Sequence, residues 1–240
     1  MNDAPPPPLD WRRTALFLDV DGTLAEFENV PGQVGPDPRR TEVLRWLCTR
    51  LGGRVAVLSG RTLNEVDRIL EASIHQVAAV HGLVQRRAGK VTEAARTSDL
   101  DGARAAAKAY ASRQPGVLVE DKGLSLALHY RLAPASEAEV QTLCLHLSKR
   151  HGLRLQPSAM VMELRAPGPD KGEALRRFMQ SAEFAGASPV MVGDDLTDEP
   201  AFAAAEAAGG CGVLVGTPRA TSARYRLPSV AAVLDWLAQT

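Results

Sequence analysis

The sequence is poor in cysteine and aromatic residues and has no excess of charge of either sign. Its three cysteines, Cys48, Cys144 and Cys211, stand far apart without the spacing of a metal site, which is typical of reduced thiols and not of a disulfide framework. Lys plus Arg and Asp plus Glu number 28 each, so no net field recruits nucleic acid or an anionic membrane. No apolar run is long enough to span a bilayer, and residues 1–10 contain four consecutive prolines and no secretory leader. We therefore expect a cytoplasmic monomer that binds any anionic ligand through local groups.

What the chain does have is an alternation of short apolar runs and segments with helical periodicity. With 240 residues, 45% of them hydrophobic, it can form one large domain or two modest ones. Alternating strands and helices predict right-handed crossovers and a parallel sheet. Strands are expected at Leu16–Leu18, Val55–Leu58, Val77–Val80, Val190–Val192 and Val213–Val215, and helices at Arg39–Leu51, from Thr62 onward, and at Lys171–Ala182, Glu199–Ala208 and Val230–Leu237.

The alternation is interrupted in the middle of the chain, where the predicted order becomes αββαββ. The fold class is therefore α/β: a Rossmann-like core with a parallel sheet flanked by helices, formed by residues 1–97 and 168–240, plus an inserted α+β cap at 98–167. The predicted cap elements are the helices Leu100–Arg113 and Pro134–Arg150 and the strands Val117–Asp121, Leu124–His129, Leu153–Leu155 and Met160–Leu164.

Two acids, Asp19 and Asp21, end the first apolar run, directly before Gly22. In open α/β sheets the chemistry lies at the carboxyl ends of the strands. Residues i and i+2 of an extended chain point the same way, so both carboxylates can face one ligand if a cation or a shared proton offsets their repulsion. A solvated turn is the alternative, whereas a calcium loop is excluded because its sixth and twelfth positions hold Leu24 and Val30.

Three further strand ends or helix starts carry polar groups. Ser59 follows the second strand, Lys171 begins a helix, and four acids lie between Asp194 and Glu199. A carboxylate nucleophile, a hydroxyl, a cation and metal-binding carboxylates are what phosphoryl transfer requires. Each also has a plain structural interpretation: Ser59 as a turn residue, Lys171 as a surface lysine despite the unfavourable helix dipole, and the acids as helix caps.

The order of these motifs resembles that of the haloacid dehalogenase (HAD) superfamily of phosphatases. Longer strings are similar to the trehalose-6-phosphate phosphatase family. Two segments depart from that family: the stretch 25–34 is acidic, which puts loop contacts in doubt, and Pro200 stands where an acid is more usual. The matching strings are Asp19-Val20-Asp21-Gly22-Thr23, Leu58-Ser59-Gly60-Arg61, His81-Gly82, residues 119–131, Glu163-Leu164-Arg165, Lys171 and residues 192–199.

The resemblance implies a HAD core and the hydrolysis of trehalose 6-phosphate to trehalose and phosphate. Asp19 would attack phosphorus, Asp21 would act as acid and then base, and the cofactor would be Mg²⁺. The implied Mg²⁺ ligands are Asp19, Asp21 through its carbonyl, and Asp194, with Asp195 and Asp198 orienting waters. The implied phosphate-binding residues are Gly22, Ser59, Gly60 and Lys171. The residues implied to bind the phosphorylated disaccharide are Arg61, His81, Gly82, Glu120, Lys122, His129, Arg131 and Glu163.

Other functions remain open from the sequence. The chain fits another sugar phosphatase of the superfamily, acting on sucrose phosphate or mannosyl-3-phosphoglycerate, or a phosphosugar mutase that retains an activating phosphate. A non-catalytic sugar-phosphate-binding regulator is the third alternative, although such a protein is expected to have lost Asp19, Asp21 or Lys171, and all three are present. The charged residues of the cap would then form a solvated ladder across paired strands.

Overall fold

The computed structural model describes residues 4–28, 31–158 and 160–239, which divide into two compact units. The core unit comprises Met1–Thr92 and Pro169–Thr240, and the cap unit comprises Glu93–Gly168. Within the described residues, every helix is too short or too polar to cross a bilayer.

The core unit is built on a sheet with the strand order β12-β11-β10-β1-β2-β3-β4-β5. Neighbours from β12 to β3 pair in parallel, and β4 runs antiparallel to β3. The parallel strands at the centre confirm the predicted fold class, whereas β4, β5 and β12 were not predicted, because they are short and lack an apolar run. The strands are β1 Thr14–Leu18, β2 Val55–Leu58, β3 Gln76–Ala79, β4 Val84–Arg87, β5 Lys90–Glu93, β10 Ser188–Gly193, β11 Cys211–Val215 and β12 Tyr225–Leu227.

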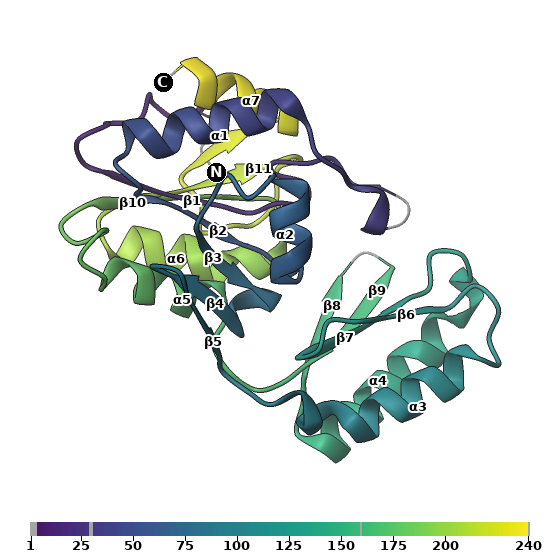
Figure 1. The fold of residues 1–240 in the computed structure, drawn as a ribbon. Coiled ribbons are helices and arrows are strands. Elements are labelled where there is room, and N and C mark those ends of the chain that lie inside the picture. The colour runs from purple at the N-terminus through teal and green to yellow at the C-terminus, as the bar shows by residue number, and fades with distance from the viewer. Residues whose placement is uncertain (1–3, 29–30, 159, 240) are drawn as a thin grey trace. The chain divides into compact units, whose positions relative to one another are not determined.

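Helices cover both faces of this sheet (Figure 1). Helices α1 (Pro38–Arg50) and α7 (Val230–Gln239) lie on one face, and α5 (Lys171–Met179) and α6 (Glu199–Ala207) lie on the other. Helix α2 (Leu63–Ile69) connects β2 to β3 and begins with the predicted capping box between Thr62 and Glu65. A sheet covered on both faces explains why its central strands β1 and β2 are buried at every position.

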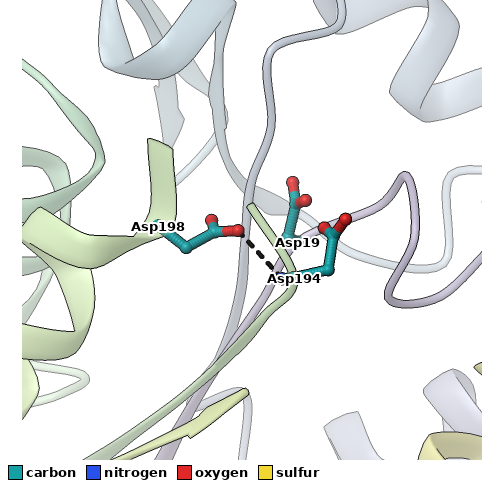
Figure 2. Close-up of side chains that lie close together, drawn as sticks. All are labelled: Asp19, Asp194 and Asp198. Atoms are coloured by element: carbon teal, nitrogen blue, oxygen red, sulfur yellow. Dashed lines mark hydrogen bonds between the residues drawn. The ribbon is translucent and has the colours of Figure 1, made fainter. Parts of the chain in front are cut away.

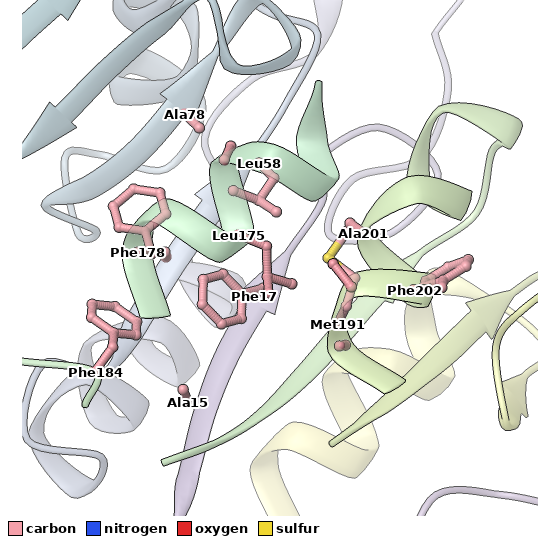
Figure 3. Close-up of a cluster of buried hydrophobic side chains, with 14 of the residues drawn as sticks. Ala15, Phe17, Leu58, Ala78, Leu175, Phe178, Phe184, Met191, Ala201 and Phe202 are labelled. Carbon is pink, nitrogen blue, oxygen red and sulfur yellow. The ribbon is translucent and has the colours of Figure 1, made fainter. Parts of the chain in front are cut away.

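The core between the sheet and helices α5 and α6 is aromatic (Figure 3). Phe17 of β1 packs against Phe178 of α5 and Phe184, with ring centroids 6.1 and 5.5 Å away, respectively. Alternate residues of β1 face opposite sides of the sheet. Ala15 and Phe17 face this cluster, and all five residues of β1 are buried. The cluster holds β1, α5 and α6 in one rigid block.

The cap unit contains two helices and a four-stranded antiparallel sheet of order β6-β7-β9-β8. Helix α3 (Asp101–Ala111) contacts β6, and α4 (Glu137–His151) contacts β8 and β9. The order of elements is the predicted αββαββ. The strands are β6 Leu118–Asp121, β7 Ser125–His129, β8 Arg154–Ser158 and β9 Val161–Arg165.

The packing predicts a large difference between two leucines of the core unit. Leu175 of α5 is fully buried, whereas Leu196 is 63% exposed. Leu175→Ala should lower the free energy of unfolding by about 2–5 kcal/mol through lost burial and a residual cavity. Leu196→Ala, the matched control, should change it by less than about 0.5 kcal/mol. Urea denaturation measures both, and equal effects would contradict the described core.

Candidate active site

Asp19 follows β1 directly and lies at the carboxyl end of the central strands. Its amide donates to the carbonyl of Val192 at 3.0 Å, which continues the pairing of β1 with β10. The Asp19 side chain is 7% exposed, and its Oδ1 lies 2.8 Å from Nζ of Lys171. The same ammonium lies 2.7 Å from Oδ1 of Asp198. A buried cation is therefore shared by two buried carboxylates.

Lys171 is placed by the start of α5. The Asp170 side chain caps this helix by accepting from the amide of Glu173 at 2.8 Å, so Lys171 occupies the first helical position, where the helix dipole disfavours a cation. Burial lowers the pKa of Lys171, but the charges of Asp19 and Asp198 outweigh burial and raise it above its usual value. Lys171 thus stays charged because two carboxylates replace the water that it has lost.

Asp198 also shapes the turn that follows β10. Its Oδ2 accepts from the amides of Asp194 and Asp195, both at 3.1 Å. A Cβ at residue 193 would lie 2.4 Å from Cγ of Asp198, so this approach requires Gly193. Figure 2 shows the Asp198 side chain bonded to the backbone at Asp194. Asp195, which was predicted to orient waters, accepts from the amide of Leu196 through its Oδ1 at 2.7 Å.

Asp19, Asp194 and Asp198 form a cluster that suits a hard divalent cation. Each offers one oxygen, and these oxygens lie within 4.8 Å of one another. Oδ1 of Asp194 is buried and has no hydrogen-bond partner among the described residues. Burial and the nearby Asp198 raise the pKa of Asp194 to about 7, and burial raises that of Asp19 well above its usual value. Crowded carboxylate oxygens with one unused are what Mg²⁺ favours, so the residues present fit the predicted cofactor.

The turn after Asp21 approaches this cluster closely. Gly22 has a φ of +73°, and its amide donates to the carbonyl of Ala25 at 2.7 Å. A Cβ at this position would lie 2.3 Å from Oδ2 of Asp194. Only glycine therefore satisfies both the left-handed backbone and the contact with Asp194.

The side chain of Asp21 has a different partner from the one expected. Its two oxygens accept from Nε and Nη2 of Arg61 at 2.7 and 2.6 Å. Arg61 also pairs with Glu65 at 3.4 Å. The sequence predicted that Asp21 would face the same ligand as Asp19 and that Arg61 would bind sugar, whereas the structure joins these two side chains in a bidentate pair. The reason is that β2 ends beside β1, which brings Arg61 within reach of Asp21.

Hydrogen bonds join the turns after β2 and β3, which brings together five residues predicted to bind phosphate or sugar. The amide of His81 donates to the carbonyl of Ser59 at 2.8 Å, and the ring of His81 lies against Gly60. The Ser59 hydroxyl accepts from the amide of Arg61 at 3.2 Å. Val80, His81 and Gly82 have φ values of 48°, 56° and 101°. Two successive non-glycine residues in the left-handed region are strained, a feature typical of functional sites.

The charged residues predicted to bind sugar gather on one sheet of the cap unit. Glu120 lies 2.9 Å from Nε2 of His129, and Lys122 lies 3.8 Å from both Glu120 and Glu163. Burial opposes ionisation of Glu120, but the hydrogen bond from His129 and the charge of Lys122 lower its pKa below its usual value. Ser125, which was not predicted, donates to Glu163 at 2.6 Å. Arg131, by contrast, is exposed beyond the end of β7.

Arg219 is the other residue that sequence reasoning missed. Its guanidinium pairs with Glu199 and donates to the carbonyls of Asp194 and Asp195 at 3.2 and 2.9 Å. It lies in the segment between β11 and β12, 20 to 25 residues from these partners, in a stretch without a recognisable motif. A long-range contact of this kind leaves no local signal in the sequence.

The fold has solved counterparts. The chain superimposes on the C-terminal domain of the Candida albicans trehalose-6-phosphate phosphatase with a TM-score of 0.82 and 21% identity, covering 95% of this chain and 92% of that one. A trehalose-6-phosphate phosphatase related protein gives a TM-score of 0.81 at 24% identity, covering 93% and 95%. The fold is that of the HAD phosphatases with a cap domain.

Sequence comparison identifies the family of phosphatases to which the chain belongs. The profile of the family described as Trehalose-phosphatase matches residues 17–231. The sequence is also 37% identical over 226 residues to the trehalose-6-phosphate phosphatase of Escherichia coli K12, covering 93% of this chain and 85% of that protein. The chain belongs to the trehalose-phosphatase family, as the sequence motifs predicted.

The raised pKa of Asp194 predicts how pH affects the metal-free protein. Its folded-state pKa of about 7 exceeds the value of about 4 expected in the unfolded chain. The folded form therefore binds more protons between these values, and stability should fall as the pH rises from about 4 to 7. Mg²⁺ displaces the proton, so its stabilising effect should grow over the same range.

Urea denaturation in EDTA and in Mg²⁺ at several pH values measures this dependence. Asp194→Asn is the control, because it removes the titrating carboxyl and should flatten the fall in stability. A wild-type profile in EDTA that matches the profile of Asp194→Asn would contradict the assignment.

Proposed function

We propose that the chain is an Mg²⁺-dependent phosphatase that hydrolyses trehalose 6-phosphate to trehalose and phosphate. Membership of the trehalose-phosphatase family supports the substrate. The observation that carries the reaction is the Asp19 carboxylate, held 2.8 Å from Lys171 at the end of β1 and beside Asp194. A buried carboxylate next to a fixed cation can attack phosphorus while the cation neutralises the phosphoryl oxygens.

The reaction proceeds in two displacements at phosphorus. In the first, an oxygen of Asp19 bonds to phosphorus, the bond from phosphorus to the sugar oxygen breaks, and Asp21 gives its proton to the departing oxygen. In the second, water attacks the phosphoaspartyl group, Asp21 takes the proton from that water, and the bond from phosphorus to Asp19 breaks. Phosphate leaves, and both acids return to their first state.

The ion pair between Arg61 and Asp21 matters for this sequence of steps. A bidentate guanidinium stabilises Asp21 as a carboxylate, the form that the second step needs. The first step needs a protonated Asp21, so Arg61 must release at least one of its two hydrogen bonds when substrate enters. The predicted role of Arg61 in binding substrate is compatible with such an exchange of partners.

The remaining residues of the core unit bind and orient. Asp19, Asp194 and the carbonyl of Asp21 would hold Mg²⁺, which when bound neutralises charge on the phosphoryl group. Ser59 and Lys171 donate to phosphoryl oxygens, together with backbone amides of the turns at Gly22 and Gly60. Asp198 holds Lys171 and the Asp194 turn in place, because both of its oxygens accept hydrogen bonds from them.

The cap unit supplies the groups that recognise the sugar. Glu120 lies 2.9 Å from Nε2 of His129, and Glu163 accepts from the Ser125 hydroxyl at 2.6 Å. Carboxylate oxygens are suited to accept from sugar hydroxyls, and Lys122, 3.8 Å from each carboxylate, can donate to the same ligand. Arg131 belongs to the same predicted set. A cytoplasmic location and a monomeric state stay predictions for this protein.

A phosphate-release panel tests the reaction and the substrate together. Trehalose 6-phosphate should be hydrolysed faster than sucrose 6-phosphate or mannosyl-3-phosphoglycerate, and EDTA should abolish the release. Asp19→Asn should lower kcat at least about a thousandfold because the nucleophile is lost. Asp235→Asn, an exposed carboxylate paired with Arg39, is the control and should keep wild-type activity. Near wild-type turnover by Asp19→Asn would refute the proposal.

Substitution of Glu163 separates sugar recognition from chemistry. Glu163→Gln weakens charge-assisted hydrogen bonds worth about 1.5–3 kcal/mol, so KM for trehalose 6-phosphate should rise at least about tenfold. Hydrolysis of p-nitrophenyl phosphate, which carries no sugar, should keep its kcat/KM. Glu139→Gln on α4 is the matched control. An equal loss on both substrates would show that Glu163 serves stability and not specificity.

A further inference from the structure

Arg219 connects two segments of the core unit that lie next to the proposed metal site. Nη2 donates to the carbonyls of Asp194 and Asp195 at 3.2 and 2.9 Å, and Nη1 donates to the carbonyl of Ala220 at 3.0 Å. Nη1 also pairs with Oε1 of Glu199. The guanidinium thus reaches from the segment after β11 to the turn after β10.

Glu199 completes this connection from the other side. Its second oxygen, Oε2, accepts from the amide of Ser222 at 2.8 Å. The Glu199 carboxylate therefore binds the segment after β11 twice, once through the Arg219 side chain and once through the backbone. Since Glu199 is the first residue of α6, the two segments are cross-linked at a rigid helix end.

The turn at Asp194 and Asp195 is consequently held through both its N–H groups and its C=O groups. The amides of Asp194 and Asp195 donate to Asp198, and their carbonyls accept from Arg219. A peptide group with both its N–H and its C=O engaged cannot rotate without losing a charge-assisted hydrogen bond. The direction in which the Asp194 carboxylate leaves the backbone is set by this double attachment.

The same guanidinium borders the space in front of Asp194. A cavity of about 310 Å³ is lined by Gly22, Asp194 and Arg219 together with residues from the end of β11 and the start of α7. The Arg219 side chain is 23% exposed, so its hydrogen bonds are only partly screened by water.

We infer that Arg219 is a positioning residue for the divalent cation, acting through the backbone of Asp194 and Asp195. The inference rests on the proposed function, because it assumes that Asp194 is a metal ligand. Partners that orient metal ligands typically change metal affinity by about 10- to 100-fold when removed. A lysine cannot replace the planar fork that donates to three carbonyls and a carboxylate at once.

The experiment compares Arg219→Met with a matched control, Arg224→Met. Arg224 lies in the same segment and pairs with Glu206 of the same helix α6, at an exposed position. Two quantities are measured: the Mg²⁺ concentration at half-maximal phosphate release from trehalose 6-phosphate, and the Mg²⁺ concentration at half of the Mg²⁺-induced rise in Tm without substrate. Arg219→Met should raise both by about tenfold, while kcat at saturating Mg²⁺ changes little.

Arg224→Met should leave both Mg²⁺ concentrations at the wild-type value, and Arg219→Lys should fall between the wild type and Arg219→Met. Should Arg219→Met fail to fold, Arg219→Lys decides through the same two readouts. Equal Mg²⁺ dependence in the wild type and the Arg219 variants would overturn the inference, even if the variants differ in Tm without Mg²⁺. A wild-type Tm that does not respond to Mg²⁺ would also overturn it. A wild type that gains Tm with Mg²⁺ but releases no phosphate would instead refute the proposed function, and the thermal readout would still decide the role of Arg219.

Discussion

The buried ammonium of Lys171, shared by Asp19 and Asp198, is the interaction on which the rest of the site depends. Two carboxylates at the end of a fully covered sheet would be costly to ionise without it. With one oxygen bound to Lys171, Asp198 uses its other oxygen to hold the amides of the Asp194 turn. The Asp194 turn then places the Asp194 carboxylate beside that of Asp19. One cation therefore organises the nucleophile, the turn and the crowded oxygens proposed to bind Mg²⁺.

The hydrophobic core fixes the positions of the elements that carry these charged residues. Phe17 precedes Asp19 by two residues, Phe178 lies two turns beyond Lys171, and Phe202 follows Asp198 by one turn; all three are fully buried in one cluster. Because close-packed side chains resist displacement, the elements that carry the charged groups cannot shift independently. Aromatic packing beneath the site thus fixes the relative positions of its charged groups.

The cap unit also carries a cluster of paired charged residues, but on a sheet surface suited to a different kind of ligand. Its sheet packs one face against α3 and α4 and carries Glu120, Lys122, His129 and Glu163 outside that core. His129 beside Glu120 and the Ser125 hydroxyl on Glu163 orient these carboxylates. Such a surface suits a polyhydroxylated molecule, whereas the core unit is suited to a phosphoryl group. The separation of the two chemistries into two units follows from the inserted αββαββ segment.

Much of this could be predicted from the sequence, because buried parallel strands are apolar runs and their carboxyl ends carry the motif residues. Asp19, Lys171 and Asp194 were predicted in this way, as was the inserted cap, since local periodicity and order along the chain are properties of the sequence itself. Strand β4 and the edge strands β5 and β12 were missed because they are short and, at their exposed positions, polar. Only the tertiary structure decided that Asp21 pairs with Arg61, that Asp198 binds Lys171, and that Arg219 holds the Asp194 turn. These partners lie 40, 27 and 25 residues apart, and contacts at such separations depend on how strands and helices pack, which no local pattern records.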